Sequence, residues 1–472
     1  MVFSSVSFLI FFLPLLLLVY YAVPRRFRWM RNLILLAASL FFYGWGGPRL
    51  LPLLLGSIAV NYICGLFAGE RQGRALSVRK TAVAAAVVIG IGLLIVFKYA
   101  GFFARTANAL GMPLPVPEIV LPIGISFFTF QGLSYVIDVY RGKAAPQRNP
   151  LNVALYISLF PQLVAGPIVR YETVSDAILE RQENLSEFSD GAVRFSVGLA
   201  KKMLLANAMG EVADAIFGLW PSTLPVVGAW LGAIAYTFQI YFDFSAYSDM
   251  AIGLGRMFGF TFCENFNYPY ISASITEFWR RWHISLSVWF RDYVYIPLGG
   301  NRCSNARRIR NVAIVWLLTG LWHGANWTFV LWGLWFLVLL LGERYVWGKL
   351  LDRLPRAVGH IYTMAAVILS WVMFRSDTVS RAFGFIGSMF GGGGTGWFTD
   401  ITIYYLRRYL PELILCVIGA FPLKGAVVRF LEKRGAQGAL IWLPKLYALA
   451  LLALSYWKLA VGSFNPFIYF QF

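Results

Sequence analysis

The stretch NVAIVWLLTGLWHGANWTFVLWGLWFLVLLL, residues 311–341, decides which class of fold the chain can adopt. It contains no aspartate, glutamate, lysine or arginine. A helix needs roughly 20 mostly apolar residues to cross a hydrocarbon core about 30 Å thick. The stretch therefore predicts a membrane-spanning helix that is long enough to be tilted or extended.

The whole chain shares this apolar character. Its 472 residues are 59% hydrophobic and only 13% charged, whereas a soluble protein is about a quarter charged. Such a chain has too few polar residues to cover a globule in water. This excludes a soluble enzyme, a disordered chain and a nucleic-acid-binding domain. The net charge of +19 is better explained by basic cytoplasmic loops than by nucleic-acid binding.

Further apolar stretches predict an all-α integral membrane protein with about ten to twelve transmembrane helices. We expect a single membrane domain over residues 1–472, with its motif core at approximately 119–345. The segment 244–300 mixes polar and apolar residues and can form short or re-entrant helices. The candidate spans lie at approximately 4–23, 32–45, 50–68, 82–99, 119–137, 151–169, 191–208, 224–242, 311–341, 357–374, 403–421 and 441–461.

The distribution of basic residues predicts the orientation of the chain. Arginines cluster between residues 25 and 31, after the first expected span, and basic residues recur in the connections at 69–80 and 141–148. The connections between these carry little net positive charge. Cytoplasmic loops are the basic ones, so the alternation predicts that the N-terminus lies outside. The acidic segment 171–190 does not follow this alternation, so the side of the membrane on which it lies is not predicted.

A histidine inside the quoted stretch is the first candidate for chemistry, because polar residues in membrane segments are costly. On one continuous helix Trp316, Gly320, His323 and Trp327 fall on the same face. Gly320 and Gly324 would let another helix approach closely. Apolar surroundings keep an imidazole neutral, and a neutral imidazole can take a proton from a hydroxyl. The alternative is a structural histidine bonded to a neighbouring helix.

A second histidine lies in an amphipathic segment. Ser274 and Glu277 fit a capping box, which predicts that a helix begins there. One face of this helix would carry Trp279, Trp282, His283, Leu286 and Phe290, and another would carry Arg280, Ser287 and Arg291. This pattern is typical of a helix at the membrane interface.

The strongest basic patch follows this segment, and Asp292 is the only acidic residue that opposes it. It is explained either by the positive-inside rule or by a cytoplasmic dock for an anionic acyl donor. Coenzyme A phosphates suit bidentate arginine contacts, and an acidic carrier protein would suit the same patch. The candidate donor-binding residues are Arg280, Arg281, Arg291, Arg302, Arg307 and Arg308.

The segment QIYFDFSAYSD, residues 239–249, closes another apolar run with two carboxylates. It either lines a wet cavity or holds helices together by hydrogen bonds. No cysteine or histidine pattern predicts a metal site, and no nucleotide-binding fingerprint is present. The substrate-channel candidates are Trp322, Asn326, Trp327, Trp282, Asp243 and Ser245.

These motifs resemble the membrane-bound O-acyltransferase family, most closely its alginate O-acetyltransferase branch. The resemblance extends over nearly the whole chain, and both histidine motifs are intact. The matching stretches are LPIGISFFTFQ (121–131), SYVIDVYRG (134–142), FPQLVAGPI (160–168), YFDFS (241–245), GLG (253–255), EFWRRWH (277–283), GLWHGA (320–325) and NPFIYF (465–470).

The resemblance implies a ring of transmembrane helices around a thin central region, with re-entrant and horizontal helices on the cytoplasmic side. It makes His323 the presumed catalytic residue, with His283 accompanying it. We expect a protein of the bacterial inner membrane, with no permanently bound cofactor, that takes acetyl from acetyl-CoA or from an acyl carrier protein. The ultimate acceptor would be an exported polysaccharide such as alginate, reached through a separate extracytoplasmic acetyltransferase.

Three alternatives stay open at this point. Two are enzymes: a D-alanyltransferase that feeds teichoic acid from a carrier protein, and a peptidoglycan O-acetyltransferase. The third is a secondary transporter, which would have inverted repeats and broken helices that meet at the bilayer midplane. No such repeat is visible in the sequence.

Overall fold

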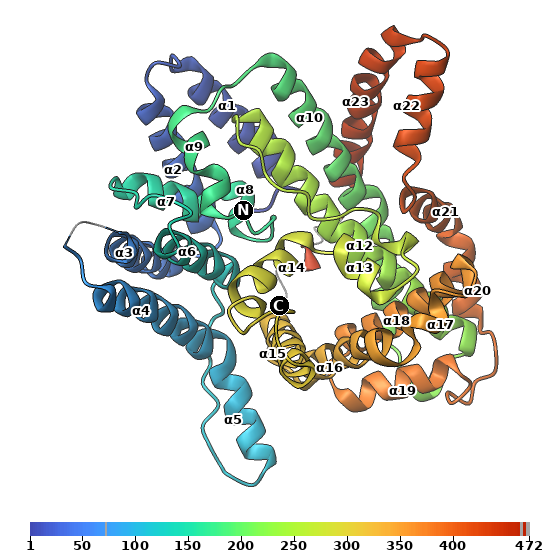
Figure 1. Ribbon diagram of the computed structural model, residues 1–472. Coiled ribbons are helices and arrows are strands. Elements are labelled where there is room, and N and C mark those ends of the chain that lie inside the picture. The colour runs from blue at the N-terminus through green and yellow to red at the C-terminus, as the bar shows by residue number, and fades with distance from the viewer. Residues whose placement is uncertain (71–72, 463–465, 469–472) are drawn as a thin grey trace. The chain divides into compact units, whose positions relative to one another are not determined.

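The computed structural model describes residues 1–70, 73–462 and 466–468 (Figure 1). All regular structure among these residues is helical, which confirms the all-α prediction. The chain packs as two compact units, one of residues 1–195 and 247–263 and the other of residues 196–246 and 264–472. The single-domain prediction stays a prediction, because two compact units can belong to one membrane domain. Asn465, Tyr469 and Phe470 of the closing motif lie outside the described residues.

The first unit consists of the helices before residue 195 and the end of α12. Its elements are η1 (Ser7–Phe12), α1 (Leu13–Ala22), α2 (Arg28–Trp45), η2 (Pro48–Leu50), α3 (Leu51–Ala68), α4 (Leu76–Leu94), η3 (Ile95–Tyr99), α5 (Ala100–Ala109), α6 (Ile125–Tyr140), α7 (Pro150–Ser158), α8 (Phe160–Leu163), α9 (Tyr171–Glu180), most of α10 (Leu185–Ala200) and the end of α12 (Val226–Met257).

The second unit contains the start of α12 and the elements after it, together with η4 and α11. Its further elements are η4 (Lys201–Ala206), α11 (Asn207–Phe217), η5 (Pro221–Thr223), η6 (Pro269–Ile271), α13 (Ile275–Arg281), α14 (Ile284–Phe290), η7 (Arg291–Tyr295), α15 (Asn305–His323), α16 (Trp327–Gly342), η8 (Glu343–Trp347), α17 (Gly348–Leu351), α18 (Arg356–Arg375), α19 (Val379–Met389), α20 (Asp400–Arg408), α21 (Leu410–Gly419), α22 (Leu423–Lys433) and α23 (Gln437–Val461).

Several helices are suited to a lipid environment. Five helices among the described residues are long and apolar enough to cross a membrane, or six if the bent pair α21 and α22 counts as one span. This is fewer than the number expected from the sequence, because some expected spans form shorter helices and others, such as the one in the 32-residue helix α12, are not apolar enough along their length. The expected count stays a prediction, since short helices can cross a membrane in pairs. The five helices are Pro48–Ala68, Leu76–Ala109, Trp327–Leu351, Arg356–Arg375 and Gln437–Val461.

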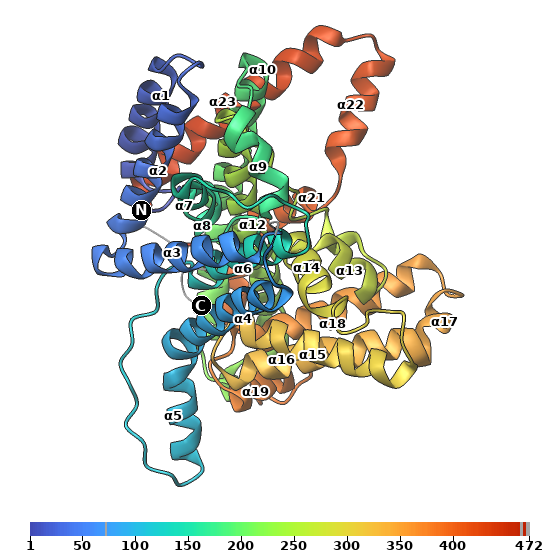
Figure 2. The same cartoon turned by 60° about the vertical axis from the view of Figure 1, so that its left-hand side comes forward.

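Apolar side chains point outward along several of these helices. On α23, which Figures 1 and 2 show forming a hairpin with α22, Trp442, Leu446 and Leu449 are all exposed. Large exposed apolar surfaces are rare on soluble monomers. A lipid-facing helix is expected to have such a surface, so this exposure agrees with the membrane prediction.

Small residues let helices of the first unit pack closely. Helices α3, α4 and α6 lie against one another (Figure 1). A Cβ on Gly65 of α3 would lie 2.3 Å from the ring of Tyr135 on α6, and one on Gly132 would lie 2.5 Å from the side chain of Asn61. A larger residue at either position would require these buried side chains or the helices that carry them to shift.

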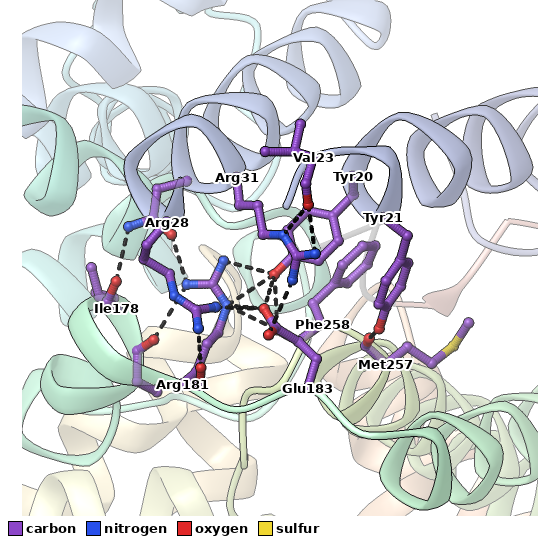
Figure 3. A network of polar contacts seen from close by, with 12 residues as sticks. Tyr20, Tyr21, Val23, Arg28, Arg31, Ile178, Arg181, Glu183, Met257 and Phe258 are labelled. Carbon is purple, nitrogen blue, oxygen red and sulfur yellow. Dashed lines mark hydrogen bonds and ion pairs between the residues drawn. The ribbon is translucent and has the colours of Figure 1, made fainter. Parts of the chain in front are cut away.

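The first unit also holds a buried network of charges around Glu183 (Figure 3). The Glu183 carboxylate lies 2.5 Å from Arg28, 3.1 Å from Arg31 and 3.5 Å from Arg181. It also accepts a hydrogen bond of 2.6 Å from the Tyr20 hydroxyl. The network joins α1, α2 and the α9–α10 connection. One carboxylate of the acidic segment 171–190 therefore serves as an internal counter-ion and not as a loop charge.

Opposing effects set the pKa of the Glu183 carboxyl group. Burial alone would raise this pKa, but the hydrogen bond from Tyr20 and the charges of Arg28 and Arg181 outweigh burial and lower it. A carboxyl group whose pKa is lowered by folding stabilises the fold above its unfolded-state pKa. This contribution is lost as the pH falls through the folded-state pKa.

We expect Glu183→Gln to lower the free energy of unfolding by about 3 to 5 kcal/mol at neutral pH, because it leaves buried arginines without their counter-ion. The difference from the wild type should shrink in acid, where the wild-type carboxylate is also neutralised. Thermal unfolding of the purified protein in detergent, measured over a pH series, checks both points. Glu187→Gln is the matched control, because Glu187 is exposed. Equal losses at every pH would contradict this account of Glu183.

The apolar stretch 311–341 is a hairpin in the second unit. Helix α15 ends at His323 and α16 begins at Trp327, and the two helices lie side by side (Figure 2). The expected single long span is therefore wrong. Gly324 adopts an extended conformation, and Asn326 caps α16 by accepting a hydrogen bond from the Thr328 amide. These two features stop one helix and start the next.

The predicted close approach at Gly320 is confirmed. A Cβ there would lie 2.5 Å from the Phe329 carbonyl oxygen and 3.4 Å from the Gly333 Cα. Its partner is the returning arm of the same hairpin. This tight contact fixes the end of α15, and with it the position of His323.

Candidate functional site

The helix that carries the second histidine begins as expected and then breaks. Ser274 caps α13 by accepting a hydrogen bond of 3.0 Å from the Glu277 amide, which confirms the predicted start. The helix ends at Arg281, and α14 starts at Ile284. The expected continuous amphipathic helix is therefore wrong. The break consists of Trp282, which is extended, and His283, which adopts a left-handed conformation with φ 44° and ψ 54°.

The break between α13 and α14 places the side chain of His283 in the protein interior, and not on a helix face at the membrane interface. The residue is 0% exposed, and its ring lies edge-on to Phe244 at 4.6 Å. Its Nδ1 lies 3.1 Å from the side-chain oxygen of Asn265. Burial lowers the pKa of His283 from 6.5 to about 3, so the imidazole is neutral at physiological pH.

The other histidine, His323, lies at the end of α15 inside a wall of aromatic rings. The imidazole is 7% exposed. Its ring centroid lies 4.9 Å from Trp322, 4.9 Å from Trp332 of α16 and 5.2 Å from Phe374 of α18. All three contacts are edge-on. Two arms of the hairpin and a third helix thus enclose the imidazole predicted to be catalytic.

Trp322 connects the two histidines. Its ring centroid lies 4.9 Å from the imidazole of His323 and 5.8 Å from that of His283. Two imidazoles therefore share one buried indole as a neighbour. Their motifs lie about 40 residues apart in the sequence, so the fold has assembled one site from two separate motifs. Such a site can move a proton in surroundings that exclude water.

A second layer of indoles surrounds this site. Trp332 is 0% exposed and contacts Trp279 of α13 at 5.7 Å and Trp371 of α18 at 6.2 Å. Among the described residues, its indole N–H has no hydrogen-bond acceptor. A buried donor of this kind is costly unless something accepts from it. A substrate carbonyl beside His323 would be a suitable acceptor.

The remaining aromatic and amide candidates have different surroundings. Trp282 is 3% exposed and stacks on Phe278 at 5.6 Å, so it belongs to the buried cluster. Asn326 caps α16 and donates a hydrogen bond of 2.8 Å to the Asp377 carbonyl. Trp327 is 52% exposed. The predicted common face of His323 and Trp327 is wrong, because the chain turns between them.

Asp243 of the polar segment 239–249 is held in an ion pair that was not predicted from the sequence. Its carboxylate lies 2.6 Å from the Lys202 ammonium, and each side chain is 2% exposed. Both also hold the C-terminal segment, since Lys202 donates to the Pro466 carbonyl at 3.0 Å and Asp243 accepts from the Ile468 amide at 2.8 Å. This geometry favours the interpretation that the segment holds helices together. A channel role for Asp243 stays a prediction.

The hydroxyl group of Ser245 has a different environment. Ser245 is 3% exposed, and its Oγ has no hydrogen-bond partner in the described part of the chain. The hydroxyl is thus available to a substrate or a water molecule, and the channel role predicted for Ser245 stays a prediction.

The six candidate donor-binding arginines fall into two groups. Arg281 is paired with Glu277 at 2.9 Å, and Arg291 is paired with Asp292 at 2.7 Å. Arg308 is bonded to the Asn305 side chain and the Asn301 carbonyl. The others are exposed and take part in none of the ion pairs found among the described residues, which leaves their guanidinium groups available to an anion. These are Arg280, Arg302 and Arg307.

Comparison with known proteins gives a consistent result. Residues 143–375 match the model of the membrane-bound O-acyltransferase family. The chain is 42% identical to a probable alginate O-acetylase of Azotobacter vinelandii and 42% identical to one of Pseudomonas putida, with full coverage of both chains in each case. It is also 32% identical to a peptidoglycan O-acetyltransferase of Helicobacter pylori, over 100% of this chain and 98% of the relative.

Proposed function

The chain belongs to the membrane-bound O-acyltransferase family, and from this premise we propose that it takes acetyl from acetyl-CoA in the cytoplasm for the O-acetylation of an exported polysaccharide. As a member of this family it is a multi-pass membrane protein and an O-acyltransferase, which sets the transporter alternative aside. Two relatives that it matches over their full length are named for alginate O-acetylation. Their names support alginate as the acceptor.

One observation carries the proposal: two buried imidazoles, those of His283 and His323, both lie beside the same indole, Trp322. A site that transfers an acyl group to oxygen needs a base for the hydroxyl proton and surroundings that keep water from hydrolysing the thioester. His323 supplies the base and His283 a second imidazole nitrogen with a lone pair, and the rings around them supply the dry surroundings.

The proposed step uses His323 as the general base. The hydroxyl oxygen of the acceptor attacks the thioester carbon while its proton passes to the imidazole. The carbon–sulfur bond then breaks, and the leaving thiolate takes the proton from the imidazolium. Trp332 can donate a hydrogen bond to the carbonyl oxygen as negative charge develops on it. The products are the acetyl ester and free coenzyme A.

We place the donor on the cytoplasmic side of the bacterial inner membrane and the N-terminus outside, in accordance with the alternation of loop charge. The acceptor is then extracytoplasmic. It is either a sugar hydroxyl or an intermediate acetyl carrier that supplies a separate extracytoplasmic transferase.

We expect the double charge reversal Arg302→Glu with Arg307→Glu to raise the KM for acetyl-CoA by about 10-fold or more, because charged contacts to phosphate are strong. The kcat should change little, since neither residue lies in the aromatic site. Initial rates with purified protein in proteoliposomes, measured at two salt concentrations, check this result. Arg434→Glu is the control, because it reverses an exposed charge in the connection between α22 and α23. If the double variant and Arg434→Glu have equal KM values for acetyl-CoA, then Arg302 and Arg307 do not bind the donor.

A deletion strain tests the function as a whole. Ester-linked acetate is measured by mass spectrometry in the exported polysaccharide, the peptidoglycan and the teichoic acid or other wall polymers. The proposal expects acetate to be lost from the exported polysaccharide and restored by the wild-type gene. Loss from peptidoglycan instead would favour the role named for the Helicobacter relative. Loss of D-alanine instead of acetate would overturn the acetyl assignment.

A further inference from the structure

Asn265 holds His283 from two directions. Its backbone carbonyl accepts a hydrogen bond of 3.0 Å from the Ile284 amide, next to the left-handed His283. Its side-chain oxygen lies 3.1 Å from Nδ1 of the imidazole. Asn265 is 0% exposed, so these contacts are shielded from water.

The contacts of Ser285 identify which end of the Asn265 amide faces the histidine. The Ser285 amide lies 3.2 Å from Oδ1 of Asn265, and the Ser285 hydroxyl lies 2.9 Å from it. A backbone N–H can only donate a hydrogen bond, so the atom that it meets must be the amide oxygen and not the amide nitrogen. This settles the orientation of the Asn265 side chain.

The tautomer of the histidine follows from that orientation. A neutral imidazole carries one N–H and one nitrogen with a lone pair. The oxygen of Asn265 can only accept, so Nδ1 must carry the hydrogen. The lone pair is then on Nε2, on the other side of the ring from Asn265.

The backbone supports a functional interpretation of this arrangement. A non-glycine residue with positive φ is uncommon, and such residues concentrate at functional sites where the surrounding structure holds them in place. His283 is one of two such residues in the described chain, the other being Tyr268. The hydrogen bonds of Asn265 to His283 and to the next two residues contribute to holding this conformation.

We propose that Asn265 is a positioning residue that keeps His283 in the Nδ1–H form, so that Nε2 is the nitrogen that accepts a proton or a hydrogen bond during acyl transfer. This inference rests on the proposed function for its catalytic meaning. The tautomer itself does not depend on that function and can be measured separately. Asn265 lies outside every motif that the sequence analysis singled out.

The tautomer is measured first, in the full-length protein in lipid. Nitrogen-15 NMR of histidine-labelled protein distinguishes a protonated ring nitrogen from one with a lone pair. The chain has three histidines, so the spectrum of His283→Asn assigns the signals of His283 by difference. We expect a protonated Nδ1 and an unprotonated Nε2 at neutral pH. The opposite tautomer would overturn the proposal.

Three variants then test the role of Asn265. Asn265→Leu removes the acceptor and keeps the number of side-chain heavy atoms and their branching, and we expect kcat to fall by about 100-fold or more with KM nearly unchanged. A comparable loss of the correct histidine tautomer in a serine protease costs about 10⁴-fold. Asn265→Asp retains an acceptor, so it should recover much of the activity and move the acid limb of the pH–rate profile upward. Ser285→Ala is the matched control, because it removes the hydroxyl contact to the same oxygen and keeps the backbone amide contact, and its kcat should stay within about 3-fold of the wild type.

These measurements separate the tautomer from the function. If Asn265→Leu folds, keeps kcat and shows the same tautomer, then Asn265 does not position His283. A second outcome is that the tautomer of His283 changes in Asn265→Leu, but neither the wild type nor any variant transfers acetyl. In that case the proposed function fails, and the positioning role of Asn265 stands. Should Asn265→Leu fail to fold, the wild-type spectrum and the pH profile of Asn265→Asp still decide the matter. An Asp variant with neither recovered activity nor a shifted profile would overturn the proposal.

Discussion

Replacing His323 with alanine should reduce kcat for acetyl transfer by about 10² to 10⁴-fold, which is the usual contribution of a general base. The reason is that this imidazole is enclosed by Trp322, Trp332 and Phe374, so water has little access to take over the proton. His323→Gln should be equally inactive, because an amide cannot accept the proton. The measurement is single-turnover release of coenzyme A by purified protein in proteoliposomes.

His360→Ala provides the matched control for this experiment. His360 belongs to α18, and its Nδ1 lies 3.2 Å from the Ser272 carbonyl, away from the aromatic contacts of His323. Its loss should leave kcat within a few-fold of the wild type. If His323→Ala retains wild-type kcat at normal expression, His323 is not the base, and the proposed step is wrong.

The second large effect is expected at His283, where side chain and backbone can be separated. His283→Ala removes the imidazole and also places a residue with a Cβ but no polar side chain in the left-handed conformation. His283→Asn removes the imidazole but suits that conformation better, because asparagine is enriched there. We expect both variants to lose about 100-fold or more in kcat, while His283→Asn unfolds at a temperature close to that of the wild type.

Thermal unfolding and initial rates of the two His283 variants decide between chemistry and structure. A purely structural histidine would give an active His283→Asn protein and an unstable His283→Ala protein. The double variant His283→Ala with His323→Ala is also informative. Two groups that act as a unit lose activity non-additively, so the double loss should be close to the larger single loss.

The sequence identified both histidines but not the geometry around His283. The capping pattern at Ser274 and Glu277 correctly predicted the start of α13. The regular apolar face then suggested that the helix continued through His283. Its break depends on a hydrogen bond from Ile284 to Asn265, which is distant in the sequence and follows no periodic pattern. Tertiary contacts of this kind cannot be predicted from local propensity.

Two other features, the turn before α16 and the ion pair of Lys202, could have been predicted from the sequence. Asn326 is a good helix-capping residue, and after two small residues it indicated that the stretch 311–341 could be a hairpin. Lys202 lies inside an expected span, where a charge calls for a partner. The carboxylate of Asp243 at the end of the next expected span was available as that partner.

The candidate donor-binding arginines show that composition alone does not identify an anion-binding site. All six arginines were equivalent in the sequence. The structure pairs Arg281 and Arg291 with neighbouring carboxylates, which leaves Arg302 and Arg307 among the better candidates for an anion. Which guanidinium groups are already neutralised depends on side-chain geometry, and the sequence does not contain that information.

The most direct test is a structure of the protein in lipid with a non-hydrolysable thioether analogue of acetyl-CoA. We expect the acyl carbonyl of the analogue to lie beside the His323 imidazole, with its oxygen within hydrogen-bond reach, about 3 Å, of the Trp332 indole nitrogen. The phosphates should lie on the side of the protein that carries Arg302 and Arg307. An acyl group bound away from both imidazoles, or a His323 ring that the donor has no route to reach, would contradict the account.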